Sequence, residues 1–475
     1  MKKLSYILNG LTDRPAPDVE INNICFDPKR CLDGDLLFLT SKKDINEYLS
    51  MQPKAATIVS DRYIPSHPEA YITTNMRNAI SQACARLYCN NLEKIKFIGI
   101  TGTNGKSTTA IMLEKILVDH GYKVGLIGTG KIKIGDEILS SPYYSMTTPS
   151  PDLLYSTIGK MESMGVNIIV MEVSSHALDQ SRVSAIKFHI GIFTNLSEEH
   201  LDYHQNINAY FESKCKLLEK SDHIIVNNDD EYGKIVISIF QNAEACGQSK
   251  DSQILITDIH DCGFCGNNFV YKSNSGEINV NIKLPGVYNV YNAMMAMRAA
   301  EIMGIPINDI KLSLEKINKI DGRYEVIHDS ITVVIDYAHT SSAFVNLLKS
   351  LYSNKKPEQS LVVVFGCGGD RDKSKRFDMA KACEEYADRI IITSDNPRSE
   401  NPLDIISDIT RNMIKKHEII VDRSDAIKHA ITSADNDAIV AIIGKGPEKY
   451  IISNGTYSSF DEAEIIHKAL KARKA

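Results

Sequence analysis

The sequence predicts a three-domain α/β protein: a small α/β N-terminal domain (1–90), a central doubly wound parallel-sheet domain with a phosphate-binding loop (91–322), and a C-terminal Rossmann-like α/β domain (323–475). Three observations support this prediction. The chain has 475 residues, which is too long for one hydrophobic core. Short apolar runs alternate with helical patterns, as in parallel sheets covered on both faces. A glycine-rich turn links the first clear central strand to a helix.

The composition is that of an ordinary globular protein, with 43% hydrophobic and 24% charged residues. The net charge is −6 and no basic block occurs, so the field that would draw a nucleic acid to the surface is missing. The first apolar stretch is too short and interrupted for a signal peptide, and no run of about 18 apolar residues follows. We therefore expect a cytoplasmic monomer with neither nucleic-acid nor membrane partners.

The ten cysteines are scattered, and the only close pair is Cys262 and Cys265. A zinc site would need a second pair or nearby histidines. We therefore expect reduced thiols in a surface turn, which suits a reducing compartment.

Apolar runs mark the expected strands. In the N-terminal domain they cover 35–39 and 55–59. In the central domain they cover 97–100, 124–127, 168–171, 190–193 and 223–226, and in the C-terminal domain 333–335, 361–365, 389–392 and 439–443. Ligands of such sheets bind beyond the carboxyl ends of the strands. The loops after the four C-terminal strands should therefore form a site.

The strongest motif spans Thr101–Thr108, between a strand and a helix. Backbone N–H groups and the helix dipole converge there on a phosphate. Lys106 would neutralise the β- and γ-phosphates, and Ser107 is placed to bind Mg²⁺. A strict pattern has glycine in place of Ile100, but the strand-to-helix context favours nucleotide binding over an ordinary glycine turn. The predicted nucleotide-binding residues are Gly102, Thr103, Asn104, Gly105, Lys106, Ser107 and Thr108.

This loop resembles that of the Mur ligase family, relatives of folylpolyglutamate synthetase. Matching motifs continue in order through residues 95–450. They are Thr147–Pro149, Met171–Arg182, Phe193–Ser197, His200–His204, Asn289–Asn292, Gly322–Arg323, Asp336–Thr340, Phe365–Asp372 and Asp395–Arg398. The resemblance is strongest to the family's tripeptide synthetases, which attach the third amino acid of a peptidoglycan stem peptide.

The resemblance implies an ATP-dependent ligase that adds meso-2,6-diaminopimelate to UDP-N-acetylmuramoyl-L-alanyl-D-glutamate through an acyl phosphate. ATP, this UDP-linked dipeptide and diaminopimelate would be its small-molecule partners. A carboxylate is a poor electrophile, so it is phosphorylated before an amine attacks. Because two anions must meet, the site needs a metal and cationic groups.

The resemblance also implies a Mg²⁺ site in which Glu172 and His200 join Ser107, oxygen and imidazole ligands that the ion accepts. The blander alternatives are a strand-end glutamate and a surface histidine. Lys214 matches a lysine that carries CO₂ in the family, and its carbamate could hold a second Mg²⁺. Lys216 is the alternative, and only register from His200 selects Lys214. The predicted catalytic residues are Lys106, Glu172, His200 and Lys214.

Three further sets of residues follow from the resemblance. The remaining ATP contacts would be Asn292, Arg323, Asp336 and His339. The UDP precursor would meet Thr147, Thr148, Ser174, Gln180 and Arg182. The amino acid would be held by Arg376, Asp395, Asn396, Pro397, Arg398, Gly444 and Glu448. Arg398 could grip the distal carboxylate of diaminopimelate through a bidentate fork, and Glu448 could meet its distal ammonium. The alternative for Arg398 is a loop cap.

The N-terminal domain departs from the family's pattern. The family holds uridine through an Asp-Ser-Arg element and a later glycine-rich loop, whereas this chain has Asp27-Pro-Lys29 and passes from Ser41 directly into a helix-like stretch. Pro447 and the segment Phe460–Ala463 also differ from the family. Two alternatives therefore stay open: a paralogue that uses another γ-glutamyl or peptide carrier, and a non-ligase nucleotide-binding regulatory module or motor. The intact metal set favours a ligase.

Overall fold

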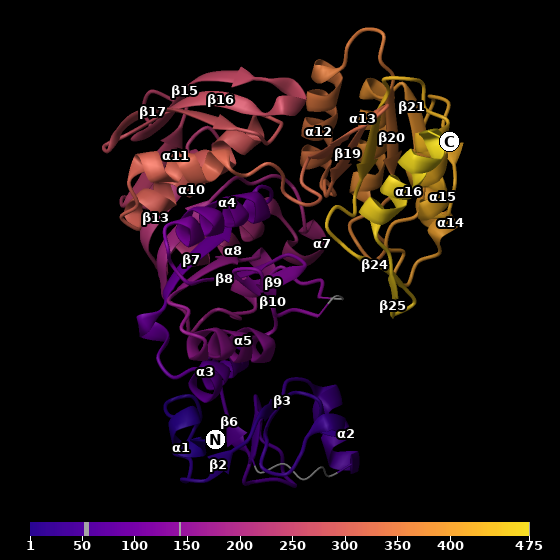
Figure 1. Cartoon of the computed structure of the whole chain (residues 1–475). Coiled ribbons are helices and arrows are strands. Elements are labelled where there is room, and N and C mark those ends of the chain that lie inside the picture. Colours follow the sequence, from indigo (N-terminus) through magenta and orange to yellow (C-terminus); the bar gives the residue numbers. More distant parts are fainter. Residues whose placement is uncertain (52–56, 142–143, 475) are drawn as a thin grey trace.

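The computed structural model describes residues 1–51, 57–141 and 144–474. Its three main sheets have four, eleven and six strands and follow one another along the chain (Figure 1). Two-stranded ribbons are formed by β1 (Lys2–Lys3) with β2 (Glu20–Ile21) and by β24 (Tyr450–Ser453) with β25 (Thr456–Ser459).

The N-terminal sheet is parallel, in the order β3-β4-β5-β6. Its strands are β3 (Ile24–Cys25), β4 (Leu36–Leu39), β5 (Thr57–Ser60) and β6 (Tyr71–Ile72), and its helices are α1 (Leu4–Ile7), η1 (Pro28–Arg30), α2 (Lys42–Met51) and α3 (Met76–Tyr88). The strand predicted at 35–39 corresponds to β4. The strand predicted at 55–59 lies partly outside the described residues, and its described part opens β5.

The central sheet has the order β10-β9-β8-β11-β7-β12-β13-β14-β15-β16-β17. Neighbours from β8 to β15 run parallel, and antiparallel strands extend both edges. The parallel strands are β7 (Lys96–Thr101), β8 (Val124–Gly128), β11 (Ile168–Glu172), β12 (Phe188–Phe193), β13 (Ser221–Asn227), β14 (Ala243–Gly247) and β15 (Ile254–Asp261). The edges are β9 (Lys131–Ile134), β10 (Glu137–Ile138), β16 (Asn267–Ser273) and β17 (Gly276–Ile282). All five predicted strands are confirmed.

Helices cover both faces of this sheet (Figure 1). One hydrophobic cluster joins it to α4, α10 and α11, and another joins it to α3 and α5. The helices are α4 (Lys106–Asp119), α5 (Pro151–Ser163), α6 (Ser175–Asp179), α7 (Leu201–His204), α8 (Ile207–Leu218), α9 (Glu231–Ile239), α10 (Tyr288–Ile302) and α11 (Ile307–Glu315), with short turns η2 (Leu92–Lys94) and η3 (Gly263–Cys265). Cys262 and Cys265 are both exposed thiols at η3, as predicted.

The C-terminal sheet has the order β18-β19-β23-β20-β21-β22, and only β18 runs antiparallel to its neighbour. Its strands are β18 (Glu325–His328), β19 (Thr332–Asp336), β20 (Leu361–Phe365), β21 (Arg389–Ile392), β22 (Glu418–Ile419) and β23 (Ile439–Ile443). One face packs on α12 (Ser341–Asn354), α13 (Ser374–Tyr386) and α14 (Pro402–Thr410), the other on α15 (Arg423–Thr432) and α16 (Glu462–Lys474). All four predicted strands are confirmed.

The predicted domain boundaries, at 90/91 and 322/323, stay predictions. Helix α3 packs on α5, so the first two sheets share one hydrophobic cluster. In the described part of the chain, no helix is both long and apolar enough to cross a bilayer. The expected cytoplasmic location and monomeric state are likewise predictions.

Candidate active site

The phosphate-binding loop joins β7 to α4 and depends on two glycines. Gly102 has φ +146° and Gly105 has φ +86°. A Cβ at Gly102 would lie 1.8 Å from Thr194 Oγ1, and a Cβ at Gly105 would lie 2.4 Å from Asn292 Oδ1. Any side chain at these points would push the loop away from its supports on the neighbouring elements.

Two lysine side chains converge on this loop. Lys106 Nζ donates to the carbonyl oxygens of Gly102 and Thr103 at 2.9 and 2.8 Å. Lys214 Nζ donates to Gly102 O at 2.8 Å and lies 4.4 Å from the ring centre of Tyr210. Burial lowers the pKa of Lys106, and burial with repulsion from Lys106 lowers the pKa of Lys214 well below its usual value. A lowered pKa favours the neutral amine of Lys214, which is the form that reacts with CO₂.

Glu172 ends β11 beside the loop and is 3% exposed. Its Oε1 accepts from Thr129 N at 2.8 Å and its Oε2 accepts from Thr129 Oγ1 at 3.0 Å. Because each oxygen has further lone pairs, this clamp orients the carboxylate while leaving it able to bind a cation.

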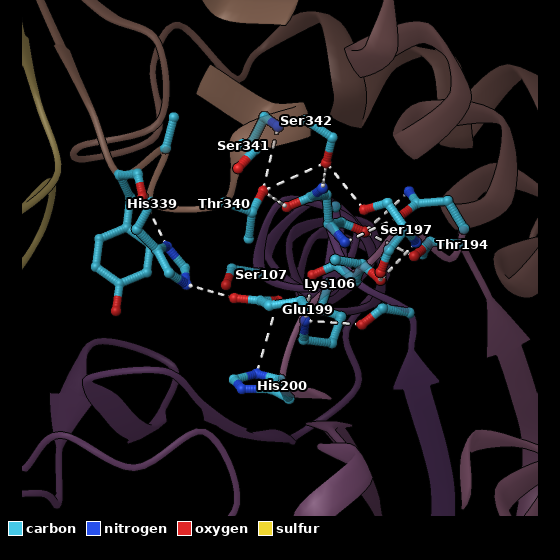
Figure 2. A pocket seen from close by; sticks show the side chains of 18 of the residues that line it. Lys106, Ser107, Thr194, Ser197, Glu199, His200, His339, Thr340, Ser341 and Ser342 are labelled. Carbon is cyan, nitrogen blue, oxygen red and sulfur yellow. Dashed lines mark hydrogen bonds and ion pairs between the residues drawn. The ribbon is translucent and has the colours of Figure 1, made fainter. Parts of the chain in front are cut away.

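Two histidines flank the carboxylate of Glu199 (Figure 2). His200 Nε2 lies 3.6 Å from Glu199 Oε2, and His339 Nε2 lies 3.5 Å from Glu199 Oε1. Burial, with repulsion from His176 and nearby cations, lowers the pKa of His200 to about 2. Burial also lowers the pKa of His339 to about 4. Both imidazoles are therefore neutral near pH 7, the state in which imidazole binds a metal.

One cavity of about 720 Å³ collects these groups from the central and C-terminal parts of the chain. The predicted residues that line it are Gly102, Thr103, Asn104, Gly105, Lys106, Ser107, Thr108, Thr147, Glu172, Ser174, His200, Lys214, Asn292, Arg323, Asp336, His339, Asp395, Asn396, Arg398, Gly444 and Glu448. The predicted nucleotide, metal and amino-acid residues thus share one space.

Hydrogen bonds cross this cavity and join its two sides. Arg323 Nη2 donates to Ser107 Oγ at 2.8 Å, and Asn104 Nδ2 donates to Ser342 Oγ at 3.1 Å. The hydroxyls of Ser197 and Ser342 are 2.9 Å apart (Figure 2). The start of α12 therefore lies against the phosphate loop, and a guanidinium lies beside the hydroxyl predicted to bind Mg²⁺.

Arg398 reaches the cavity from the loop after β21, with φ +52°. Its Nη1 donates to Gly369 O at 2.8 Å, and its backbone N donates to Ile452 O at 3.0 Å. The first bond holds one arm of the guanidinium and leaves its other N–H groups for a carboxylate.

Five predicted residues of the site lie outside the cavity lining: Thr148, Gln180, Arg182, Arg376 and Pro397. Arg182 donates to Thr148 O at 2.7 Å and to Gln180 Oε1 at 3.0 and 2.7 Å. Thr148, Gln180 and Arg182 thus form a hydrogen-bonded cluster near the cavity residue Ser174. Their predicted contact with the UDP precursor stays a prediction.

Arg376 does not fit its predicted role in holding the amino acid. It is 1% exposed, and its guanidinium pairs with Glu400 at 2.9 Å and with Asp408 at 2.8 Å. Two carboxylates already neutralise the guanidinium, and Arg376 does not line the cavity. We therefore assign it a structural role. Arg371, on the loop before α13, lines the cavity and is the better candidate.

Several residues near the site were missed from the sequence: Glu199, Tyr337, Arg371, Lys375 and Lys445. Three of them had an available signal. Glu199 precedes a predicted ligand, and Tyr337 and Arg371 lie inside the motifs Asp336–Thr340 and Phe365–Asp372.

The predicted ligands fit a Mg²⁺ ion that arrives with a nucleotide. Within residues 1–51, 57–141 and 144–474, no group of three or more His, Cys, Asp or Glu could hold a metal ion. Mg²⁺ is usually held by one or two carboxylates together with substrate phosphates and water. The oriented carboxylate of Glu172, the hydroxyl of Ser107 and the neutral imidazole of His200 beside a phosphate loop match that requirement.

A phosphate loop facing a second α/β sheet across a polar cavity defines a nucleotide-dependent enzyme with a second substrate subsite. Residues 100–300 match the family described as Mur ligase middle domain, and residues 322–446 match Mur ligase, glutamate ligase domain. The chain belongs to the Mur ligase family and is an ATP-dependent ligase.

Individual relatives agree with this assignment. The UDP-N-acetylmuramoyl-L-alanyl-D-glutamate--2,6-diaminopimelate ligase of Clostridium tetani is 35% identical, covering 99% of this chain and 98% of its own length. That of Aquifex aeolicus is 39% identical, covering 88% and 86%. A solved structure of a ligase of the same name matches with TM-score 0.70 and 27% identity over 100% of both chains. Folylpolyglutamate synthase of Mycobacterium tuberculosis, complexed with ADP and AMPPCP, shares the fold with TM-score 0.63 and 17% identity, over 74% of this chain and 89% of its own. The predicted fold class and family are confirmed.

Proposed function

We propose that this chain joins meso-2,6-diaminopimelate to UDP-N-acetylmuramoyl-L-alanyl-D-glutamate, with Mg²⁺-ATP converting a carboxylate of the dipeptide into an acyl phosphate. One observation carries this proposal: a single cavity unites the phosphate loop with Arg398, Asn396 and Glu448. Full-length relatives that bear the corresponding name support the choice of substrates.

At the nucleotide end, the chain supplies positive charge around the transferring phosphoryl group. The ammonium of Lys106 donates to carbonyl oxygens of the phosphate loop, and Arg323 donates to Ser107 from the other side of the cavity. Mg²⁺ would be held by Ser107, Glu172 and His200, and it would neutralise charge on the phosphates. These fixed charges stabilise the transfer without covalent chemistry by a side chain.

Lys214 would take part as a carbamate. Its buried amine, with a lowered pKa, is suited to attack the carbon of CO₂, and loss of one proton from nitrogen would leave a carbamate anion. A carbamate would place a negative charge beside Lys106, which suits a second Mg²⁺. The carbamate of Lys214 would then attract the ammonium of Lys106.

At the other end, opposite charges suit a zwitterionic amino acid. Arg398 would bind the distal carboxylate of diaminopimelate and Glu448 the distal ammonium. The reacting amine of the same molecule would attack the acyl carbon, phosphate would leave, and the amine would lose a proton. Contacts such as Arg323 with Ser107 would hold the two sides together and exclude water, which would otherwise hydrolyse the acyl phosphate.

A different carrier in place of the UDP-dipeptide is the second candidate, and the N-terminal sheet favours it. Asp27 accepts from Lys29 N at 2.9 Å and caps η1, and α2 begins at Lys42 where the family has a glycine-rich loop. The uridine-binding elements expected from the family are therefore replaced.

A ligation assay separates these candidates. Protein and Mg²⁺-ATP are mixed with the UDP-dipeptide and either meso-diaminopimelate or L-lysine, and products are detected by mass. Product with diaminopimelate only supports the proposal. Turnover on a smaller γ-glutamyl acceptor, with none on the UDP-dipeptide, would favour the second candidate. ATP hydrolysis that needs neither substrate would contradict both.

A further inference from the structure

Lys445, directly after β23, is 0% exposed and does not line the cavity. Its ammonium nevertheless reaches three residues that do. Nζ lies 3.0 Å from Asn396 Oδ1 and 3.4 Å from both Asp395 Oδ1 and Glu448 Oε2. An ammonium has three N–H donors. Each of its donors therefore has one acceptor, and all three acceptors belong to residues predicted to hold the amino acid.

These contacts fix the orientation of the Asn396 amide. Its Oδ1 accepts from Lys445 Nζ and from Ile452 N at 3.0 Å. Its Nδ2 donates to Glu448 Oε2 at 2.8 Å. Two donors on Oδ1 exclude the flipped amide, so the side chain presents its N–H₂ group toward Glu448.

Glu448 is held from both sides. Its Oε2 receives Lys445 and Asn396, while Tyr337 OH donates to Oε1 at 3.1 Å. A carboxylate offers about four acceptor positions. Three are occupied, which leaves one on the cavity-lining residue for a ligand ammonium.

A deeper layer of charge supports this arrangement. Arg423 is 2% exposed and pairs with Glu462 at 2.6 Å. Burial would raise the pKa of Asp395, but Lys445, Arg423 and Arg398 outweigh it and lower that pKa. The ring centres of Tyr450 and Phe460 lie 5.6 and 5.9 Å from Lys445 Nζ and close its surroundings to water. The buried ammonium of Lys445 thus balances the negative charges of Asp395 and Glu448, and each of its three N–H donors has an acceptor.

We propose that Lys445 is a positioning residue for amino-acid selection: through Asn396 and Glu448 it fixes the one acceptor that recognises the distal ammonium of the incoming diamino acid. This inference rests on the proposed function and deepens it. Lys445 touches no substrate. It acts by fixing the position of the Glu448 carboxylate and the number of its lone pairs that stay available to a ligand.

The test compares Lys445→Met with Lys449→Met, the same change at an exposed lysine four residues away. Two amino acids serve as probes: meso-diaminopimelate, and 2-aminopimelate, which keeps the distal carboxylate but lacks the distal ammonium. The readout is the ratio of kcat/KM for the two probes, with KM for ATP measured in parallel. We expect the wild type to prefer diaminopimelate by about 10- to 100-fold, as for a lost hydrogen bond to a charged group. Lys445→Met should bring the ratio close to 1 and keep KM for ATP within about twofold, while Lys449→Met should match the wild type.

A folded Lys445→Met enzyme with an unchanged ratio would overturn the inference. A merely structural role would lower the melting temperature or raise KM for ATP without altering the ratio. If Lys445→Met does not fold, Lys445→Arg keeps the charge but cannot reproduce the three contacts. The kcat/KM ratio of Lys445→Arg should then lie between the wild-type ratio and 1. A ratio equal to that of the wild type would overturn the inference. Wild-type protein that ligates neither probe would instead refute the proposed function.

Discussion

Replacing Arg398 by alanine should weaken the use of diaminopimelate while leaving the use of ATP almost unchanged. The guanidinium is anchored by its bond to Gly369 O at 2.8 Å, so the remaining N–H groups are pre-oriented for a carboxylate. Hydrogen bonds to a charged group contribute about 1.5–3 kcal/mol. At about 1.4 kcal/mol per factor of ten, kcat/KM for diaminopimelate should fall about 10- to 150-fold.

The fold at this position should survive the change. The φ of Arg398 is +52°, and alanine carries the same Cβ, so the backbone strain is unaltered. The backbone bond from Arg398 N to Ile452 O, at 3.0 Å, is also kept. The comparison isolates the guanidinium.

The assay is phosphate release with product confirmed by mass, varying diaminopimelate and ATP in turn. Arg398→Lys keeps the charge without the bidentate fork and should give an intermediate loss. Arg411→Ala, at an exposed arginine of the same domain, is the control. Equal losses in kcat/KM for ATP and diaminopimelate, or no loss for either, would refute the reasoning.

Three other substitutions test separate parts of the account. Tyr337→Phe removes the hydrogen bond from Tyr337 OH to Glu448 at 3.1 Å, while the ring of Tyr337 lies 4.5 Å from the guanidinium of Arg323. An ATP analogue should tighten diaminopimelate binding about 3- to 10-fold less in this variant than in the wild type, as measured by calorimetry. An undiminished effect of the analogue would contradict this link between the two subsites. The hydrogen bond from Arg376 lowers the pKa of Glu400 to about 2. The ionised carboxylate therefore stabilises the folded state fully above the unfolded pKa of 4.5, and this contribution is lost as pH falls toward 2. Glu400→Gln should therefore remove about 1–3 kcal/mol of this acid-sensitive stability in urea unfolding between pH 3 and 6, and an identical pH slope would count against it. Lys214→Arg cannot form a carbamate and should lose about 100-fold or more in kcat while still binding ATP; full activity, or no carbamate carbon in the NMR spectrum of wild type equilibrated with ¹³C-bicarbonate, would exclude the modification.

The sequence predicted the elements that surround the site because buried parallel strands are continuous apolar runs. All nine predicted strands of the two large sheets are present, from β7 to β23. The strands β16 and β17, at one end of the central sheet, were not predicted, because exposed residues such as Asn279 and Asn281 interrupt the apolar residues of β17 and leave no such run. The phosphate loop was predictable since its spacing is local.

The amino-acid subsite was harder to predict because it depends on partners far apart in sequence. Arg371 lies in the motif Phe365–Asp372 and Arg376 lies shortly after it, and only the ion pair of Arg376 with Glu400 shows which of them is already neutralised. Lys445 is flanked by glycines and gives no sign in the sequence that its ammonium meets three acceptors. Long-range electrostatic pairing of this kind requires the fold.

Oxygen transfer from the acceptor to phosphate tests the acyl-phosphate step most directly. The dipeptide is labelled with ¹⁸O in its reacting carboxylate, the ligation is run with unlabelled ATP and water, and the released phosphate is analysed by mass spectrometry. We expect one ¹⁸O atom in each phosphate, because the bond between the carbonyl carbon and that oxygen breaks when the amine attacks. Unlabelled phosphate accompanying normal product formation would contradict it.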